Sequence, residues 1–132
     1  MDRVIEKELG FMTLRAEITL LGRDVHVLLS GGSGHIGSTV LAVPRPSLKG
    51  DGSISSTASV INVAGHKDEV LLRNMAEKIS AAKSAVVVCA GGVHLDNITP
   101  QQINAVVEAA KEITDEIVSY GKPVRTVEIP DR

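Results

Sequence analysis

The sequence is poor in aromatic residues, since Phe11 and Tyr120 are the only two and tryptophan is absent. Proteins that bind single-stranded nucleic acid stack successive bases on aromatic side chains. The formal net charge of −2 also gives little attraction toward phosphate backbones or anionic lipids. The sequence therefore disfavours a nucleic acid or a membrane as partner.

Cysteine and long apolar runs are equally scarce. The single cysteine, Cys89, cannot form a disulfide framework within one chain. No apolar run approaches the roughly 20 residues that span a bilayer, and the N-terminal MDRVIEKELG lacks the apolar core of a signal peptide. We therefore expect a cytoplasmic protein with a single domain over residues 1–132.

The first half of the chain alternates between apolar and polar residues, which predicts strands. The alternation is regular from Met12 to Leu20 and resumes over 25–29. A third strand is predicted over 36–43, ended by prolines that cannot donate to a central ladder. Residues 54–63 carry apolar side chains on both faces, which predicts a strand inside the sheet.

In the second half of the chain the spacing of the apolar residues changes. Apolar residues over 71–82 recur at helical spacing, and the apolar run 85–90 predicts a strand covered on both faces. A second helix is predicted to begin with Thr99 as N-cap, Pro100 in the first helical position and Gln102 completing a capping box.

Gly121 and Pro123 are expected to end this second helix, and residues 124–129 are expected to add a last edge strand. These elements predict an α+β fold in which a largely antiparallel sheet of about five to six strands has two helices packed on one face.

Three of the four histidines lie at predicted element boundaries, each preceded within two residues by glycine: His35 in GSGHIG, His66 in AGHKDE and His94 in GGVHLDN. Boundaries at one edge of a sheet converge in space, and glycine lets a ligand or another backbone approach closely. Any one boundary histidine is more often a cap or loop side chain, but three such settings favour a common site. His26 lacks this context and is interpreted as a surface residue.

Several neighbours of these histidines suit a charged ligand. The GGSG run before His35 offers backbone N–H groups for an anion, with a glycine bulge as the alternative. Arg45 and Lys49 flank a proline-rich loop and would suit a phosphate, or are simply solvated. Asp68 and Asp96 each follow a histidine by two residues, where a carboxylate orients an imidazole or joins a metal, or only begins a helix or turn.

Three neutral imidazoles with a carboxylate or water would suit a divalent metal, although their spacing matches no known signature. Cys89 lies in an apolar stretch, where a thiol is usually inert packing. A nucleophilic enzyme is therefore less well supported.

Three blocks of the sequence resemble a known family: GGSGHIG followed by PRPSL, then GHKD, then VHLDNIT. Together they resemble the LpdD-like prenylated-flavin chaperones, the small D subunits of gallate-type decarboxylase systems, over residues 12–118. The resemblance implies a non-catalytic protein that binds prenylated FMN and assists its delivery to, or the maturation of, a UbiD-type decarboxylase. A flavin prenyltransferase is a further candidate partner.

Within that resemblance we expect the cofactor to contact eleven residues: Gly32, Ser33, Gly34, His35, Arg45, His66, Lys67, Asp68, His94, Asp96 and Asn97. A divalent metal, if bound, would use His35, His66 and His94. With so few aromatic residues, aliphatic side chains such as Leu48, Ile36 and Val93 would have to cover the flavin ring. A site shared between two copies would close its other side, so a homodimer is expected.

Two alternatives remain open at the level of sequence. One is a small metal-dependent hydrolase or decarboxylase that uses the three histidines. The other is a structural accessory subunit that binds the decarboxylase and no flavin.

Overall fold

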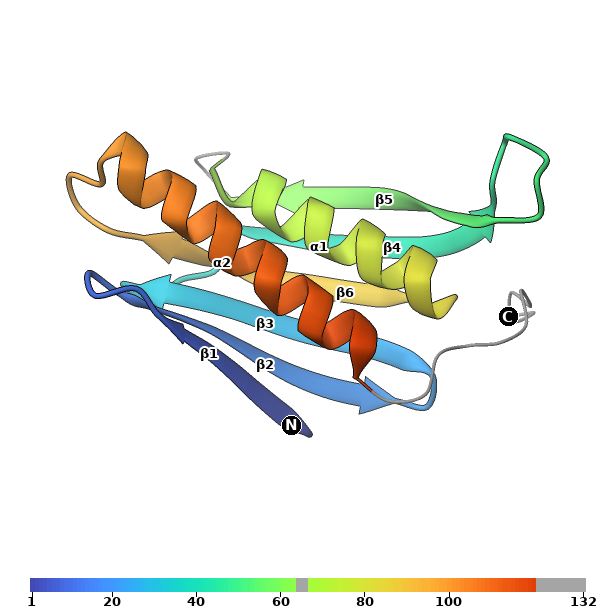
Figure 1. Cartoon of the computed structure of the whole chain (residues 1–132), viewed down its shortest axis with the longest axis horizontal. Coiled ribbons are helices and arrows are strands. Elements are labelled where there is room, and N and C mark those ends of the chain that lie inside the picture. Colours follow the sequence, from blue (N-terminus) through green and yellow to red (C-terminus); the bar gives the residue numbers. More distant parts are fainter. Residues whose placement is uncertain (64–66, 121–132) are drawn as a thin grey trace.

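The computed structural model describes residues 1–63 and 67–120, which form six strands and two helices (Figure 1). In chain order they are β1 (Arg3–Glu8), β2 (Thr13–Leu21), β3 (Asp24–Gly32), β4 (Ser38–Pro46), β5 (Ile54–Asn62), α1 (Lys67–Lys83), β6 (Val87–His94) and α2 (Pro100–Ser119).

The strands form one sheet in the order β1-β2-β3-β6-β4-β5. Only the β3–β6 pair is parallel, and the other four pairs are antiparallel. Both helices lie on the same side of this sheet (Figure 1). The α+β fold with a largely antiparallel sheet and two helices on one face is therefore confirmed.

The core lies between the sheet and the helices. Leu14, Ala16 and Ile18 of β2 are buried there, as the alternation predicted, whereas Leu20 near the end of the strand is 40% exposed. Alternate residues of β3 and β6 are buried in the same way. The helices add their apolar stripes. The largest fully buried side chains are Leu14, Ile18, Leu29, Leu72, Met75, Ile79, Ile113, Ile117, Val27, Val40, Val87 and Cys89.

The start of α2 confirms the predicted capping box. The Thr99 hydroxyl accepts from the Gln102 N–H at 3.1 Å, and the Gln102 side chain accepts from the Thr99 N–H at 2.9 Å. Pro100 opens the helix, where its missing N–H costs nothing. This start lies directly after the loop that leaves β6, so it fixes the position of that loop.

Three strand predictions were wrong or incomplete. Residues 54–63 were expected inside the sheet, but β5 is an edge strand that pairs with β4 alone among the described strands, and its outward Ile61 is exposed rather than covered. The charged segment Arg3–Glu8 was not predicted to be a strand, and it forms the other edge.

β4 also continues through Pro44 to Pro46 instead of ending before them. Its pairing with β6 stops at Ala42, so neither proline has to donate across to β6. The expected strand 124–129 and the expected helix end at Gly121 and Pro123 lie outside the described residues.

Candidate functional site

The glycine-rich stretch becomes a short connection over the end of β6. Because β6 lies between β3 and β4, the chain must cross it to pass from one to the other. Residues 33–37, which we call the crossing segment, are fastened to β6 at both ends. The Ser33 N–H donates to the His94 carbonyl at 3.0 Å, and the Gly37 N–H donates to the Gly91 carbonyl at 2.8 Å.

His35, in the middle of the crossing segment, pairs with a buried carboxylate. Its Nε2 lies 3.2 Å from Oδ2 of Asp68, and its Nδ1 lies 3.2 Å from the Ser33 carbonyl. Asp68 comes from the first turn of α1, and its other oxygen accepts from the Val93 N–H at 2.8 Å. The Asp68 side chain is only 7% exposed, whereas that of His35 is 40% exposed. One carboxylate thus joins α1, β6 and the crossing segment.

Glycines make this packing possible. A Cβ atom on Gly37 would lie 2.0 Å from Asp68 Oδ2, and one on Gly92 would lie 2.6 Å from His35 Nε2. Gly32 has a φ of +68°, and a Cβ there would lie 1.9 Å from the His94 carbonyl oxygen. The clustered glycines are therefore explained by the close approach of His35, Asp68 and the end of β6.

His94 lies beside this pair at the end of β6. Its ring is perpendicular to that of His35, with 6.2 Å between the ring centroids. Its Nε2 lies 3.0 Å from Asp96 Oδ1, in the exposed loop that leads to α2. Asn97 turns the same loop with a φ of 58°. The two rings present polar edges at one end of the sheet.

An apolar cavity of about 360 Å³ adjoins this cluster, between the start of α1, the end of β6 and the first half of α2. Asp68 and His94 are its polar residues. Its other eight lining residues are apolar: Val70, Leu71, Val93, Leu95, Ile98, Ile103, Val106 and Val107. A concave, mostly apolar space with a few converging polar groups is the usual form of a small-molecule site.

A family model described as the prenylated flavin chaperone LpdD-like domain matches residues 8–122. The chain belongs to this family. The resemblance found in the three sequence blocks is therefore confirmed.

Other comparisons add little. No curated protein matches the chain. Among solved structures, it resembles a chain of a novel chaperone complex for yeast 20S proteasome assembly, with a TM-score of 0.46 and 11% identity over 84% of this chain and 96% of that one. A likeness this distant carries no argument about function. No described helix is long and apolar enough to cross a membrane.

The structure gathers most of the predicted site residues. His35, Asp68 and His94 come together as described, with Asp96 and Asn97 in the adjoining loop. Ser33 and Gly34 precede His35 in the crossing segment. The Ser33 N–H, one of the amides expected to bind an anion, is already bonded to His94. Lys67 is the first residue of α1, and His66 lies outside the described residues.

Arg45 is not brought into this cluster. It lies near the far end of β4, seven residues or roughly 23 Å from Ser38 at the end beside the cluster. Its guanidinium donates to the Thr57 hydroxyl at 2.7 Å and to the Pro46 carbonyl at 3.2 Å. Leu48, expected to cover the ring, lies beyond that same end and is 91% exposed.

The metal prediction gains no support from the described residues. Over 1–63 and 67–120, no three side chains of His, Cys, Asp or Glu gather closely enough to hold an ion. His35 and His94 are neighbours, but His66, the third proposed ligand, is outside these ranges.

Sequence reasoning missed the apolar cavity. Val106 and Ile103 were assigned to the apolar stripe of the second helix that faces the core. Such a stripe does not indicate where a cavity remains between this helix and α1. The one available signal was Ile103, which is 46% exposed at the rim of the cavity although it belongs to the apolar stripe.

Proposed function

We propose that this LpdD-like chaperone binds prenylated FMN with the ring system in the apolar cavity, and delivers it to a UbiD-type decarboxylase. The observation that carries the proposal is the 360 Å³ cavity whose polar wall is the Asp68 carboxylate, itself bonded to His35. The family match supplies the class of ligand.

The cavity lining fits a prenylated flavin. The fused rings and the added prenyl carbons are apolar on their faces, and eight aliphatic residues surround the space. In this proposal Val93, Leu95 and Ile98 cover the flavin ring, because the chain has so few aromatic residues that could do so. Val93 was already expected in this role from the sequence, and Leu95 and Ile98 take the place of Leu48.

Asp68 retains capacity for a ligand. A carboxylate offers about four lone-pair sites, and two are used by the Val93 N–H and the His35 ring. A remaining site can accept from a flavin ring N–H. His94, which also lines the cavity, offers a second polar contact.

The size of the cavity suits a carrier. At about 360 Å³ it lies near the lower end of the roughly 300–1,000 Å³ typical of ligand pockets. It encloses the ring system and leaves the ribityl phosphate outside, toward the exposed Ser33 and Gly34 of the crossing segment. A cofactor that is enclosed only in part can be both held and released.

A transfer experiment tests the proposal. The protein is co-expressed with a flavin prenyltransferase, purified without oxygen and mixed with an apo decarboxylase of the UbiD type. After the two proteins are separated, the flavin absorbance and the activity of the decarboxylase are measured. We expect the wild type to transfer cofactor and His35→Ala to carry and transfer several-fold less.

Arg45→Ala is the matched control, since Arg45 lies at the opposite end of β4 and should leave transfer unchanged. Turnover of substrate by the isolated protein would contradict the proposal and favour an enzyme. Stable binding to the decarboxylase with no flavin carried would contradict it in favour of a structural subunit.

A further inference from the structure

The face of the sheet away from the helices has an uncharged centre. Successive strands bring their outward-facing side chains into rows, and two such rows cross the middle of β3, β6, β4 and β5. The first row is His26, Val88, Leu41 and Ser59, and the second is Leu28, Ala90, Thr39 and Ile61. None of these eight residues carries a formal charge at pH 7 when histidine is neutral.

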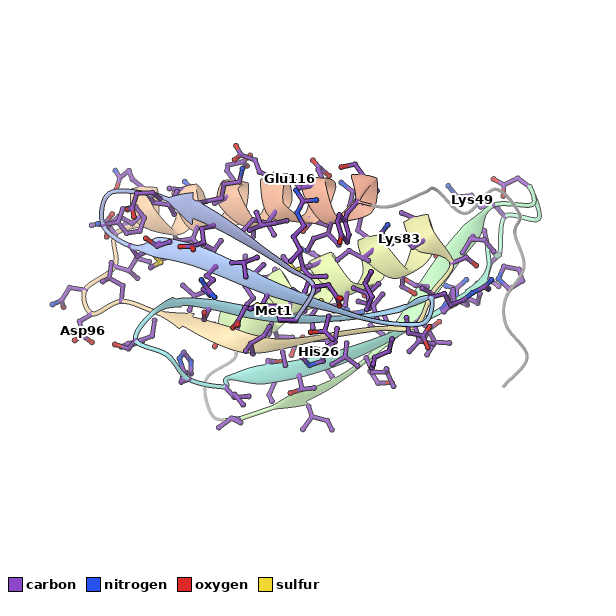
Figure 2. The ribbon with its side chains drawn as sticks, turned by 90° about the horizontal axis from the view of Figure 1, so that it is seen from below. Met1, His26, Lys49, Lys83, Asp96 and Glu116 are labelled. Atoms are coloured by element: carbon purple, nitrogen blue, oxygen red, sulfur yellow. The ribbon has the colours of Figure 1, made fainter. Side chains whose placement is uncertain are left out.

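The described helices do not cover this face. Both helices lie on the other side of the sheet, and the labelled His26 lies on the side away from them (Figure 2). Several of the apolar side chains here are accessible, since Leu41 is 40%, Val43 is 43% and Ile61 is 75% exposed. An apolar strip that runs across neighbouring strands is more than scattered surface hydrophobicity.

The charged residues on this face lie outside these two rows. On β2, the outward-facing Arg15 lies 3.1 Å from Glu6 of β1 and 3.7 Å from Glu17. At the far end of β4, Arg45 is bonded to Thr57. A second identical face can therefore meet these central rows with uncharged side chains opposite uncharged side chains.

The face is also large enough for a stable dimer. Six strands about 4.8 Å apart, each with about eight residues at 3.3 Å, give a footprint of roughly 750 Å². A standard interface buries about 800 Å² from each partner. Sheets that pack face to face in this way, about 10 Å apart, are common in proteins.

We infer that a second copy of this chain binds here, so that two sheets pack face to face around a twofold axis. In such a symmetric interface each copy uses the same patch, which has to be complementary to itself. The uncharged centre and the area meet that requirement. Leu41 and Val88, adjacent in the register, lie at the middle of the contact.

This interface leaves the cavity free, because the cavity lies on the helix side of the sheet. A second copy therefore does not close the cofactor site. From the sequence, a homodimer was expected because a second copy would close that site, so the dimer inferred here has a different basis. The inference does not rest on the proposed function and can fail separately from it.

The oligomeric state tests the inference. Sedimentation equilibrium at 10–100 µM should give a mass near 27.8 kDa, twice the 13.9 kDa of one chain. Leu41→Glu places two carboxylates near the twofold axis and should raise the dissociation constant at least tenfold. Leu48→Glu is the control, because the same change on a 91% exposed side chain away from the face should leave the dimer intact.

A second variant keeps the inference testable if Leu41→Glu does not fold. Ile61→Glu changes a side chain that is already 75% exposed on an edge strand, so the fold should survive, and it too should weaken the dimer at least tenfold. Circular dichroism confirms that each variant is folded. A monomeric wild type at 100 µM, or a dimer that both variants leave unchanged, would overturn the inference. A monomer that gains mass only with the decarboxylase, and fails to do so in Leu41→Glu and Ile61→Glu, would assign the face to that protein instead.

Discussion

The carboxylate of Asp68 lies 3.2 Å from Nε2 of His35, although 33 residues separate the two in the sequence. The same carboxylate accepts from the Val93 N–H. One buried acid therefore fixes the crossing segment, the first turn of α1 and the end of β6 relative to one another. The wall of the cavity depends on this arrangement.

Removal of this acid should destabilise the fold. Asp68→Ala leaves the Val93 N–H without its acceptor and leaves a space beside His35. We expect the free energy of unfolding to fall by about 1–3 kcal/mol, measured by urea denaturation. Asp115→Ala is the control, because Asp115 is 63% exposed and its pair with Lys78 should contribute less than about 1 kcal/mol. Equal losses in the two variants would contradict the role given to Asp68.

The glycines of the crossing segment should differ in their tolerance of alanine. In Gly37→Ala the added Cβ would lie 2.0 Å from Asp68 Oδ2, so the His35–Asp68 pair has to move. We expect a loss of about 1–3 kcal/mol in unfolding free energy and weaker retention of flavin. In Gly34→Ala the Cβ would meet nothing within 4 Å, so the free energy of unfolding should stay near the wild-type value. If Gly34→Ala proved the more harmful, the crossing segment would not pack as described.

The capping box of α2 should contribute measurably to stability. Thr99→Ala removes the acceptor of the Gln102 N–H at the start of the helix that forms one side of the cavity. The expected cost is about 1 kcal/mol, within a range of roughly 0.5–2 kcal/mol, and thermal unfolding can measure it. Ser119→Ala, at the other end of α2, provides the comparison and should cost less. No change in Thr99→Ala would contradict the cap.

Cys89 should make stability fall at alkaline pH. Burial raises the pKa of its thiol above the ordinary value of 9.0, so above that pH the unfolded chain loses a proton that the folded chain keeps. The contribution is therefore complete below pH 9 and is lost as the pH rises further. Between pH 8 and pH 10 the wild type should lose about 1 kcal/mol more unfolding free energy than Cys89→Ala. Parallel pH profiles of the two proteins would contradict this burial.

Local signals predicted much of the fold. The alternation from Met12 and the capping box at Thr99 each depend on a few neighbouring residues, and both were confirmed. The insertion of β6 between β3 and β4 depends on pairing between distant strands, which periodicity does not encode. The same holds for Ile61, which is exposed because it lies on the sheet face that the described helices leave uncovered.

The candidate site was also predictable only where local sequence signals mark it. Glycine next to His35 and His94 marked the boundaries that meet at one end of the sheet. Arg45 was included because it lies close in the sequence, but β4 carries it to the opposite end. The cavity arises where α1 and α2 part above β6, so only the packed structure shows it.

The central claim is that the cavity holds prenylated FMN, and native mass spectrometry tests it most directly. The protein and two variants are purified without oxygen after co-expression with a flavin prenyltransferase. Val107→Trp fills the cavity, whereas Glu108→Trp places the same side chain on the neighbouring residue of α2, which is exposed and outside the lining. We predict that the wild type and Glu108→Trp carry the added mass of prenylated FMN and that Val107→Trp does not. Bare wild-type protein, or a folded Val107→Trp that carries the cofactor as well as the wild type, would contradict the account.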